Sequence, residues 1–568
     1  MEKVEQLSKQ QIKQLSPEER ASYRERLQNY KKALKEQSKR EQQRIREEIQ
    51  ANLRFGIRGR NLKPQQVSAL LGPTNSGKTY QALQKLLERG SGTYAAPLRM
   101  LAREAYESLQ EQLGDQVGLI TGEEKINPEA PILCTTTEMA PLQGDMLVLD
   151  EVHWAADPQR GWAWTRLLIG AEYKQLVLMG SVDVLPLLQS CFGEDLQVQI
   201  FERLGNLIWD RGVSISKLEG GDAVVVYSRK TALYLAKQLT KQYGSERVAV
   251  LYGSMPLESR LTELDRLRSG SADLLVCTDV VGHGLNLPIR RIVFAETSKY
   301  DGQKRRNLKP WEVAQIAGRA GRYLNHPEGF VAYLTSSKWY QPDPGVIQRG
   351  LSPTVLIDEE QQLYGFRRVS RALIRPSLSD LGPVKISLLH QAIEQWYKTA
   401  RQELRSASWI DLEQPQEILG RLRIVRRTLR KSGQHLDLEQ VWTLMHSPLN
   451  SDNSYQAQLL SDLTNALVGK KKLSSYLSVK IGSSSLEDAE QIAAGAAALR
   501  WFVGCFGEEH GVGMQQAANL EAKASRRVEK LLPQTIINTP DGCQSCGAEC
   551  APWFDFCYGC AFGYDDYW

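Results

Sequence analysis

The sequence predicts an α/β fold in which two parallel-sheet domains follow one another and a helical region comes after them. Short apolar runs alternate with helical patterns between residues 63 and 348, and most of these runs end in a turn rich in Gly, Thr or Ser. Beyond about residue 350 the pattern becomes helical. Strands that alternate with helices form parallel sheets covered on both faces, and ligands bind at the carboxyl ends of their strands. We therefore expect a charged helical arm, two sheet domains, a helical region and a small tail, over residues 1–62, 63–207, 208–348, 349–538 and 539–568.

The overall composition indicates a multidomain protein without a membrane span. The chain has 568 residues, of which 42% are hydrophobic, and it contains no apolar run of the ~18 residues needed to cross a bilayer. Residues 1–15 carry acidic side chains and lack an apolar core, so no targeting peptide is evident and a cytoplasmic, bacterial-type protein is expected. The net charge of +5 is only weak support for a nucleic-acid partner.

Residues 1–60 hold most of the positive charge. They contain 16 Lys and Arg against 9 Glu, an excess of seven that leaves the rest of the chain near −2. Ser16, Pro17 and Glu19 have the pattern of a helix start. The apolar stripe that follows fades across residues 35–44 and consists of Tyr23, Leu27, Tyr30 and Leu34. Two interpretations are open: a long solvated helix, or a basic arm that contacts nucleic acid or a partner.

The first sheet domain opens with a phosphate-binding loop. Residues 67–71 form an apolar run that suits a buried strand, and residues 80–87 have helical spacing. The segment between them has the spacing G-x-x-x-x-G-K-T and comprises Gly72, Pro73, Thr74, Asn75, Ser76, Gly77, Lys78 and Thr79. Its backbone N–H groups and the positive end of the helix favour phosphate, Lys78 adds charge for the β and γ phosphates, and Thr79 can ligate Mg²⁺. The motif predicts binding of ATP or GTP.

An acid pair follows a later strand of the same domain. Residues 146–149 form the strand, and Asp150, Glu151, Val152 and His153 come directly after it. Downstream of a phosphate loop, Asp150 is expected to hold the Mg²⁺ that Thr79 also contacts, and Glu151 to position or deprotonate the attacking water. An acid at a strand end can also simply cap the next helix. The loop at residues 72–79 favours the catalytic interpretation.

The second sheet domain carries an arginine motif in place of a phosphate loop. Residues 315–322 have the sequence Gln-Ile-Ala-Gly-Arg-Ala-Gly-Arg, which places Arg319 and Arg322 on one helix face. An arginine supplied to a γ-phosphate stabilises transition-state charge and is worth roughly 10³–10⁵ in rate. Nucleotide bound between the two domains would close the cleft and hydrolysis would open it, which is the action of a motor.

The segments GPTNSGKT, DEVH and QIAGRAGR, in this order, resemble those of superfamily-two helicases of the DExH-box kind. Residues 65–340 are more closely similar to the Suv-three family, the helicase of the mitochondrial RNA degradosome and its bacterial relatives. The Asn-Ser variant of the loop and residues 160–166 (Arg-Gly-Trp-Ala-Trp-Thr-Arg) are the most specific parts of the match. The resemblance implies two RecA-like domains and 3′-to-5′ translocation on a single strand. It also favours RNA over DNA as substrate and leaves room for a nuclease partner.

The resemblance also implies a role for each matching residue. Lys78 and Thr79 would bind phosphate and Mg²⁺, Asp150 would ligate the metal through water, and Glu151 would be the catalytic base. The water-placing residue and the two arginine fingers would be Gln315, Arg319 and Arg322. Contacts to phosphates and sugars, which do not report base sequence, are implied for Arg99, Thr137, Ser228 and Thr278.

Two features depart from the family pattern or add to it. His153 ends the acid motif, at a position where the family often lacks His. Residues 300–306 (Tyr-Asp-Gly-Gln-Lys-Arg-Arg) suit a hairpin with a type I′ turn. This hairpin is either a strand-splitting pin, which related helicases often place before the arginine motif, or a plain surface hairpin.

The tail holds five of the nine cysteines, and the other four are scattered. This distribution favours one metal site in a reducing compartment over a disulfide framework. Two C-x-x-C pairs have the spacing of a tetrahedral Zn²⁺ site formed by Cys543, Cys546, Cys557 and Cys560. Such a zinc ribbon either staples a tail too small to build a core, or grips RNA or a partner through its aromatic side chains.

These observations predict an ATP-dependent nucleic-acid helicase that acts on single-stranded and duplex substrates. A nucleic-acid-dependent ATPase that works as a clamp or ribonucleoprotein remodeller, without processive unwinding, would carry the same motor motifs and stays open. An inactive ATPase that serves as a scaffold conflicts with the complete set of Lys78, Glu151, Arg319 and Arg322.

Overall fold

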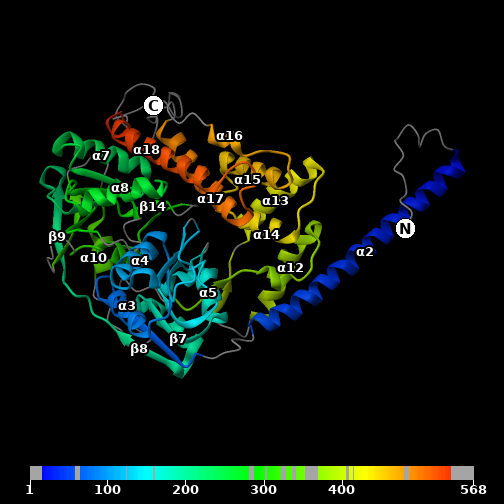
Figure 1. Cartoon of the computed structure of the whole chain (residues 1–568), viewed down its shortest axis with the longest axis horizontal. Helices are drawn as coiled ribbons and strands as arrows, with labels where there is room; N and C mark the ends of the chain where they lie inside the picture. Colours follow the sequence, from blue (N-terminus) through cyan, green and yellow to red (C-terminus); the bar gives the residue numbers. More distant parts are fainter. Residues whose placement is uncertain are drawn as a thin grey trace, which may run out of the picture.

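The computed structural model of the chain confirms the α/β class, with two sheets, parallel except for one short antiparallel edge strand in the first, followed by a helical region (Figure 1). The structure describes residues 16–57, 64–122, 124–157, 160–279, 287–300, 304–321, 328–335, 341–351, 369–404, 409–413, 415–478 and 485–538. The predicted zinc tail and Arg322 lie outside the described residues.

The first sheet has eight strands in the order β4-β3-β5-β2-β6-β7-β1-β8. The strands are β1 (Gln66–Leu71), β2 (Gly92–Ala96), β3 (Val117–Ile120), β4 (Lys125–Ile126), β5 (Ile132–Thr136), β6 (Gln143–Leu149), β7 (Glu172–Gly180) and β8 (Leu196–Ile200). Its helices are α3 (Lys78–Arg89), α4 (Arg99–Leu113), α5 (Gly161–Gly170) and α6 (Leu185–Phe192). Alternate residues of β1 enter two different cores: Val67 packs on the side of α5 and α6, and Leu70 on the side of α3 and α4. Helices therefore cover both faces of the sheet, as predicted.

The second sheet has six strands in the order β11-β12-β10-β13-β16-β9, and every pair is parallel. The strands are β9 (Leu207–Ser214), β10 (Asp222–Val225), β11 (Val248–Leu251), β12 (Leu274–Cys277), β13 (Arg291–Phe294) and β16 (Gly329–Thr335). Its helices are α7 (Arg229–Tyr243), α8 (Leu257–Arg268), α9 (Pro310–Ala317) and α10 (Pro344–Leu351). Strands β10 to β13 are buried along their whole length, which explains why they are apolar runs without alternation.

The C-terminal region is helical, and it contacts both sheet domains. Its helices are α11 (Leu378–Leu381), α12 (Leu389–Glu403), α13 (Gln416–Ser432), α14 (Leu438–Met445), α15 (Ser454–Leu467), α16 (Ser474–Leu477), α17 (Leu486–Phe506) and α18 (Met514–Asn538). A small parallel sheet, β17 (Ala372–Ile374) with β18 (Ile410–Leu412), was not predicted; β17 packs against α5. Helix α18 packs on α7 and α8 of the second domain.

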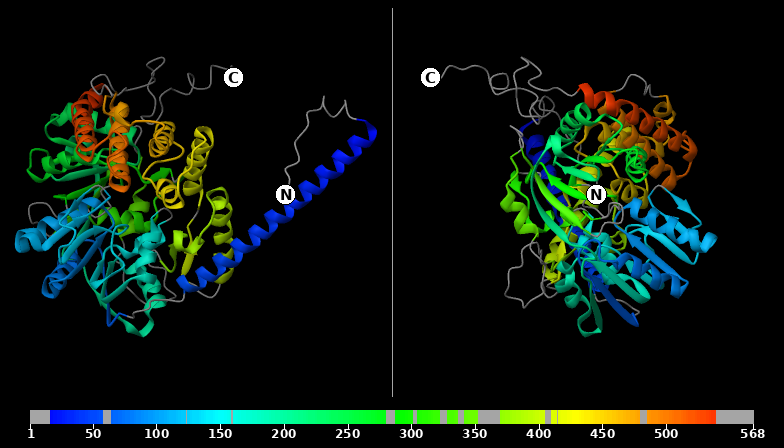
Figure 2. Two further views of the ribbon diagram at one scale, coloured as in Figure 1. Left: turned by 45° about the vertical axis from the view of Figure 1, so that its right-hand side comes forward. Right: turned by 90° about the vertical axis from the view of Figure 1, so that its left-hand side faces the viewer.

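A 41-residue helix, α2 (Pro17–Ile57), projects from the body (Figures 1 and 2). Its predicted start is confirmed, because the Glu19 N–H donates to Ser16 Oγ at 3.2 Å and the Ser16 N–H donates to the Glu19 carboxylate at 2.8 Å. Ile45 and Ile49 are buried in the core of the helical region, on the side of α11 and α12. This anchor was not predicted. Within the described ranges, every helix is too short or too polar to span a bilayer.

Candidate active site

The phosphate loop joins the end of β1 to the start of α3. Asn75 and Gly77 have φ of 59° and 81°, in the left-handed region. Such turns direct successive backbone N–H groups into one concavity, which suits an anion. At Gly72 a Cβ would lie 2.5 Å from the Phe201 carbonyl oxygen, so only glycine fits beside the segment that leaves β8. The loop therefore has the shape that phosphate binding requires.

Lys78 lies over this loop and is held by it. Its Nζ donates hydrogen bonds to the carbonyl oxygens of Gly72 and Pro73, at 2.8 and 2.6 Å, and to Ser76 Oγ at 3.1 Å. The cation is thus positioned above the N–H groups at the start of α3, where the helix dipole also favours negative charge. These donors fit the phosphates of a nucleotide.

Asp150 follows β6 and is only 8% exposed. The Tyr94 hydroxyl donates to Asp150 Oδ2 at 2.7 Å, and the Glu151 N–H donates to Asp150 Oδ1 at 2.8 Å. Burial and the neighbouring Glu151 carboxylate raise the pKa of Asp150 to about 7, while the charge of Lys78 acts in the opposite direction. A buried carboxyl of this kind ionises most readily beside a cation, so Asp150 is suited to act as a Mg²⁺ ligand.

Glu151 adopts φ 48° and ψ 51°, a left-handed conformation that is uncommon outside glycine. Such strain persists only where surrounding contacts impose it, and it is concentrated at functional sites. Two contacts hold this turn: Trp164 Nε1 donates to the Asp150 carbonyl at 2.8 Å, and His153 Nδ1 lies 3.3 Å from Glu151 Oε2. His153 and Trp164 were not predicted as site residues, although the acid motif and the Trp-containing segment contain them.

The arginine motif of the second domain lies directly against the phosphate loop of the first. Gln315 is on α9, and Arg319 follows the helix end and is buried. At Gly318 a Cβ would collide with Thr74 Oγ1, so the two motifs touch through the smallest side chain available. The structure thus brings together residues that lie more than two hundred positions apart in sequence.

Arg203 joins the two motifs and was not predicted. It lies in the segment between β8 and β9, where the Leu204 N–H also donates to the Asn75 carbonyl at 2.8 Å. Arg203 Nη1 donates to the Thr74 carbonyl at 3.1 Å and to the Gly318 carbonyl at 2.7 Å, and Nη2 donates to the carbonyl of Ala320. One guanidinium thereby holds the phosphate loop to the arginine motif. No short motif marks it, so sequence alone could not have found it.

Comparison with known proteins agrees with this geometry. The description "DEXQ-box helicase domain of Suv3" matches residues 58–201, and "Helicase conserved C-terminal domain" matches residues 199–324. These two matches together cover residues 58–324, called the Suv3-type core from here on. The family description specifies Gln at the position of His153, so the acid motif of this Suv3-type core ends differently.

Two curated relatives show the extent of the similarity. The chain is 41% identical over 287 residues to the mitochondrial ATP-dependent RNA helicase SUV3 of Saccharomyces paradoxus, covering 47% of this chain and 38% of that protein. It is 38% identical over 310 residues to the mitochondrial DExH-box ATP-dependent RNA helicase DExH16 of Arabidopsis thaliana, covering 51% and 54%. The chain therefore spans about half the length, or less, of these relatives. Among solved structures, S. cerevisiae Dbp5 bound to RNA and ADP BeF3 matches 48% of this chain and 80% of that one at 19% identity, with a TM-score of 0.37.

The prediction of a cytoplasmic protein is contradicted by this comparison. The SUV3 relatives from two yeasts and rice, and the DExH16 relative from Arabidopsis, are mitochondrial proteins by name. The prediction rested on the composition of residues 1–15, and that composition does not identify a compartment.

The four residues proposed to contact nucleic acid follow four strands of the Suv3-type core. Arg99 and Thr137 come after the neighbouring strands β2 and β5, and Ser228 and Thr278 after the neighbouring strands β10 and β12. Burial lowers the pKa of the Arg99 guanidinium, so an added phosphate would favour its charge.

Two of these residues already make local hydrogen bonds, and a third is buried. The Thr137 hydroxyl is buried and donates to the Ala96 carbonyl at 3.0 Å. Ser228 Oγ caps α7 by accepting from the Thr231 N–H at 3.0 Å, and Thr278 is buried. Direct contact with nucleic acid through the Thr137 or Ser228 hydroxyl would require its present bond to be shared or exchanged.

The Trp-containing segment at residues 160–166 explains how the strand-end loops are held. Arg160 Nη2 donates to the Pro97 carbonyl at 2.6 Å and pairs with Glu138 at 2.7 Å. Arg166 Nη2 donates to the Ala140 carbonyl at 2.6 Å. The two arginines thereby fix the loops after β2 and β5, which carry Arg99 and Thr137. In the sequence, Arg160 and Arg166 could be recognised only as part of the family-specific segment at residues 160–166, without a role.

The predicted hairpin is present as β14 (Ser298–Tyr300) paired antiparallel with β15 (Arg305–Asn307), and its turn at residues 301–303 lies outside the described residues. Burial raises the pKa of Glu312 on α9, but hydrogen bonds from Arg306, the Lys309 N–H and Lys299 outweigh it and lower the pKa to about 2. The hairpin is thus tied to the helix that carries Gln315.

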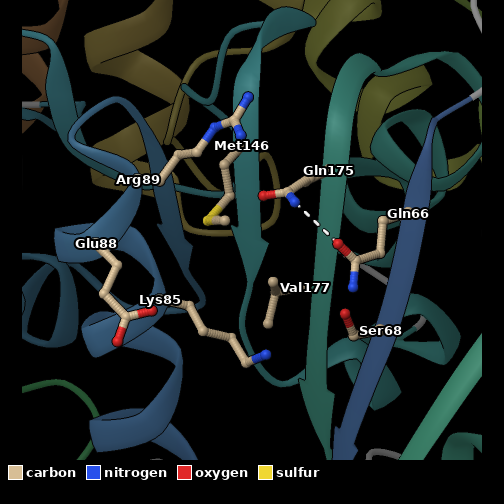
Figure 3. Close-up of a pocket in the computed structure, with 8 residues that line it drawn as sticks. All are labelled: Gln66, Ser68, Lys85, Glu88, Arg89, Met146, Gln175 and Val177. Carbon is tan, nitrogen blue, oxygen red and sulfur yellow. Dashed lines mark hydrogen bonds between the residues drawn. The ribbon is translucent and has the colours of Figure 1, made fainter.

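A hollow of about 250 Å³ lies between α3 and the strands β1, β6 and β7 of the first sheet (Figure 3). Gln66 of β1 and Gln175 of β7 line it, and the Gln175 side chain donates to Gln66 Oε1 at 2.9 Å. Lys85 and Arg89 line it from the C-terminal half of α3, far along the helix from Lys78. It is therefore separate from the phosphate loop.

Proposed function

We propose that the chain is an ATP-dependent RNA helicase that moves 3′ to 5′ along a single strand and separates duplexes. The observation that carries the proposal is the contact of Gly318 and Arg203 with Thr74, which joins the arginine motif to the phosphate loop. A nucleotide bound by the loop would lie at the boundary of two domains, so its hydrolysis would change their separation. The mitochondrial relatives are RNA helicases by name, which supports RNA as the substrate.

Each residue of the site has a chemical role in this proposal. ATP, when bound, supplies the phosphoanhydride bond whose hydrolysis powers the cycle. The loop N–H groups and Lys78 would bind its phosphates, and Thr79 with Asp150 would hold Mg²⁺. Glu151 would accept the proton of the attacking water. Gln315, Arg319 and Arg322 would orient the water and stabilise charge from the second domain.

Movement along the strand follows from the division of contacts between domains. Arg99 and Thr137 belong to the first domain, and Ser228 and Thr278 to the second. If both pairs bind backbone phosphates, a change in domain separation shifts one pair along the strand relative to the other. Contacts of this kind carry no base preference.

The β14–β15 hairpin would separate the strands of a duplex. Tyr300 is 66% exposed at the end of β14, while Arg306 is engaged with Glu312. We propose that Tyr300 presents its ring to the terminal base pair and that Arg306 keeps the hairpin rigid. Aromatic side chains stack on bases without sequence preference.

The zinc ribbon remains a proposal, because its four cysteines lie outside the described residues. Metal analysis of the full chain should give one Zn²⁺ per molecule. Replacement of Cys543 and Cys546 by Ser should abolish it. A wild-type chain without stoichiometric zinc would refute the site.

Unwinding of tailed duplexes tests the helicase proposal. Matched RNA and DNA duplexes with a 3′ or a 5′ single-stranded tail would be incubated with ATP, and Lys78→Ala would serve as the control. We expect strand separation of 3′-tailed RNA duplexes that is lost in the control. Preferential opening of 5′-tailed duplexes would refute the direction. ATP hydrolysis stimulated by nucleic acid without any strand separation would indicate the clamp or remodeller instead.

A further inference from the structure

We propose that one face of α2 binds the phosphate backbone of the nucleic acid on which the motor acts. The presence of that substrate rests on the proposed function. At about 100° per residue, seven exposed side chains between residues 24 and 46 of α2 fall within an arc of about 80°. This basic face consists of Arg24, Gln28, Lys31, Lys35, Lys39, Gln42 and Arg46.

Charge on α2 is segregated by face. The basic face spans roughly 33 Å of helix at about 1.5 Å per residue and contains no carboxylate. The glutamates of the helix all lie outside this face: Glu18, Glu25, Glu36 and Glu47 beyond one border, and Glu19, Glu41 and Glu48 further round beyond the other. A helix that needs charge only for solubility gains most from opposite signs mixed at i, i+4 spacing. A continuous face without acids lacks these stabilising ion pairs along its whole length, which favours a binding role for its cations.

The body holds this face in a fixed orientation. Ile45 and Ile49 bury the C-terminal part of α2 against α11 and α12, and Glu48 lies against Gly382. On the helical projection the basic face adjoins the side that carries Ile45 and Ile49, so it lies beside the anchor. The helix leaves the body as a single projecting element in the left view of Figure 2. A substrate that emerges from the core on this side would meet cations rather than carboxylates.

The chemistry of the face selects a polyanion. Five cations, with two Gln between them that can also donate to phosphate oxygens, match a backbone contact that ignores sequence. A DNA duplex carries one negative charge per ~1.7 Å of its axis, so a face of this length meets many phosphates in any register. The apolar residues Leu27 and Leu34 lie outside the basic face. A protein partner would use that other side of the helix.

Charge removal from the basic face tests the proposal against an equal removal elsewhere on α2. The first variant is Lys31→Gln/Lys35→Gln/Lys39→Gln. The control is Arg26→Gln/Arg40→Gln/Arg44→Gln, which removes three charges from the opposite side of the same helix. Gln is a good helix former, and circular dichroism would verify that both variants keep the helix content of the wild type.

Binding would be measured on the full chain without ATP, by fluorescence anisotropy over a range of salt concentrations. The probes are an RNA duplex with a single-stranded 3′ tail and a DNA duplex of the same sequence and tail. We expect the basic-face variant to bind both about tenfold more weakly at low salt, since exposed ion pairs are each worth roughly 0.2–1 kcal/mol. The slope of log K against log salt should fall by about 2 to 3. The control should bind like the wild type.

Equal losses in the two variants, or no loss in either, would overturn the proposal. No loss in either would direct the search to a protein partner on the side of Leu27 and Leu34. Because the assay needs no hydrolysis, it can be read even if the chain proves not to unwind duplexes. Conversely, if α2 does not bind nucleic acid, ATP hydrolysis and unwinding at saturating substrate are unaffected. Failure of the α2 proposal can therefore be distinguished from failure of the helicase proposal.

Discussion

Replacement of Arg203 by Ala should slow ATP hydrolysis without weakening ATP binding. The side chain bonds to the carbonyls of Gly318 and Ala320 in the second domain and of Thr74 in the first. Its loss leaves the loop, Lys78 and Asp150 intact, because all of these belong to the first domain. What it removes is the link that holds the arginine motif over the loop.

The size of the effect follows from the two bonds that cross between domains. A hydrogen bond to a charged group contributes about 1.5–3 kcal/mol. Arg203 is half-buried, so water competes for its donors and a total of about 1.5 kcal/mol is the appropriate figure for both bonds. If closure precedes hydrolysis, this amount corresponds to about a tenfold lower kcat.

The assay is steady-state ATP hydrolysis with saturating nucleic acid. We expect kcat to fall about tenfold in Arg203→Ala while KM for ATP changes little, the signature of an interaction made after binding. Arg203→Lys should be intermediate, because an ammonium cannot reproduce the planar fork. Arg211→Ala, an exposed arginine on β9, is the control.

Gly318→Ala provides an independent test of the same closure, because its Cβ would collide with Thr74 Oγ1. It should lower kcat at least as far as Arg203→Ala. Wild-type kcat in Arg203→Ala, or an equal loss in Arg211→Ala, would refute the reasoning.

Three further predictions concern catalysis and stability. Glu151→Gln should lower single-turnover ATP hydrolysis by about 10²–10⁴ while a fluorescent nucleotide still binds; turnover near the wild-type rate would exclude Glu151 as the base. Burial raises the pKa of Glu413 to about 7, and within the described part of the chain its Oε2 is buried without a hydrogen bond. The folded protein therefore favours the neutral carboxyl, and the stability that this form contributes is lost as the pH rises from about 4.5 through 7. Glu413→Gln should therefore raise the thermal midpoint at pH 8 but not at pH 4.5, and a gain independent of pH would contradict this cause. Asp222→Ala should destabilise the second domain by about 1–3 kcal/mol, because Arg291 loses its bonds to Asp222 at 2.6 and 3.0 Å and retains that to Asp210 at 2.9 Å; unchanged thermal unfolding would refute it.

The parts of the site that were predicted from sequence are those encoded locally. The phosphate loop needs only a strand, a glycine turn and a helix within about 20 residues, and each has its own pattern. The acid pair follows an apolar strand in the same direct way. Their arrangement at the carboxyl ends of parallel strands follows from topology, and it places Lys78 close enough to Asp150 for its charge to lower the pKa of that carboxyl.

The parts that were missed depend on partners distant in sequence. Arg203 bonds to backbone carbonyls, which every residue has, so nothing in the sequence identifies its partners. The pairing of β17 with β18 joins Ala372 to Ile410 through runs of three residues, too short for a periodic signal. Ile45 and Ile49 sit beyond the point where the apolar stripe of α2 fades. Only the presence of α12 makes them an anchor.

The helical region is attached to the two sheet domains in unequal ways. Helix α17 runs from the core of the second domain, through Leu486 and Ala489, into the core of the helical region, through Leu499 and Phe502. Relative motion there would have to bend a continuous helix, whose interior contains no proline. Within the described residues, the attachment to the first domain shares no helix with it: Val369 and Ala372 are buried in the core beside α5, and the Arg375 guanidinium lies 3.5 Å from the centre of the Trp162 ring. Separation there would expose these side chains but would not bend a helix. Opening of the nucleotide cleft should therefore move the first domain against a unit formed by the second domain and the helical region.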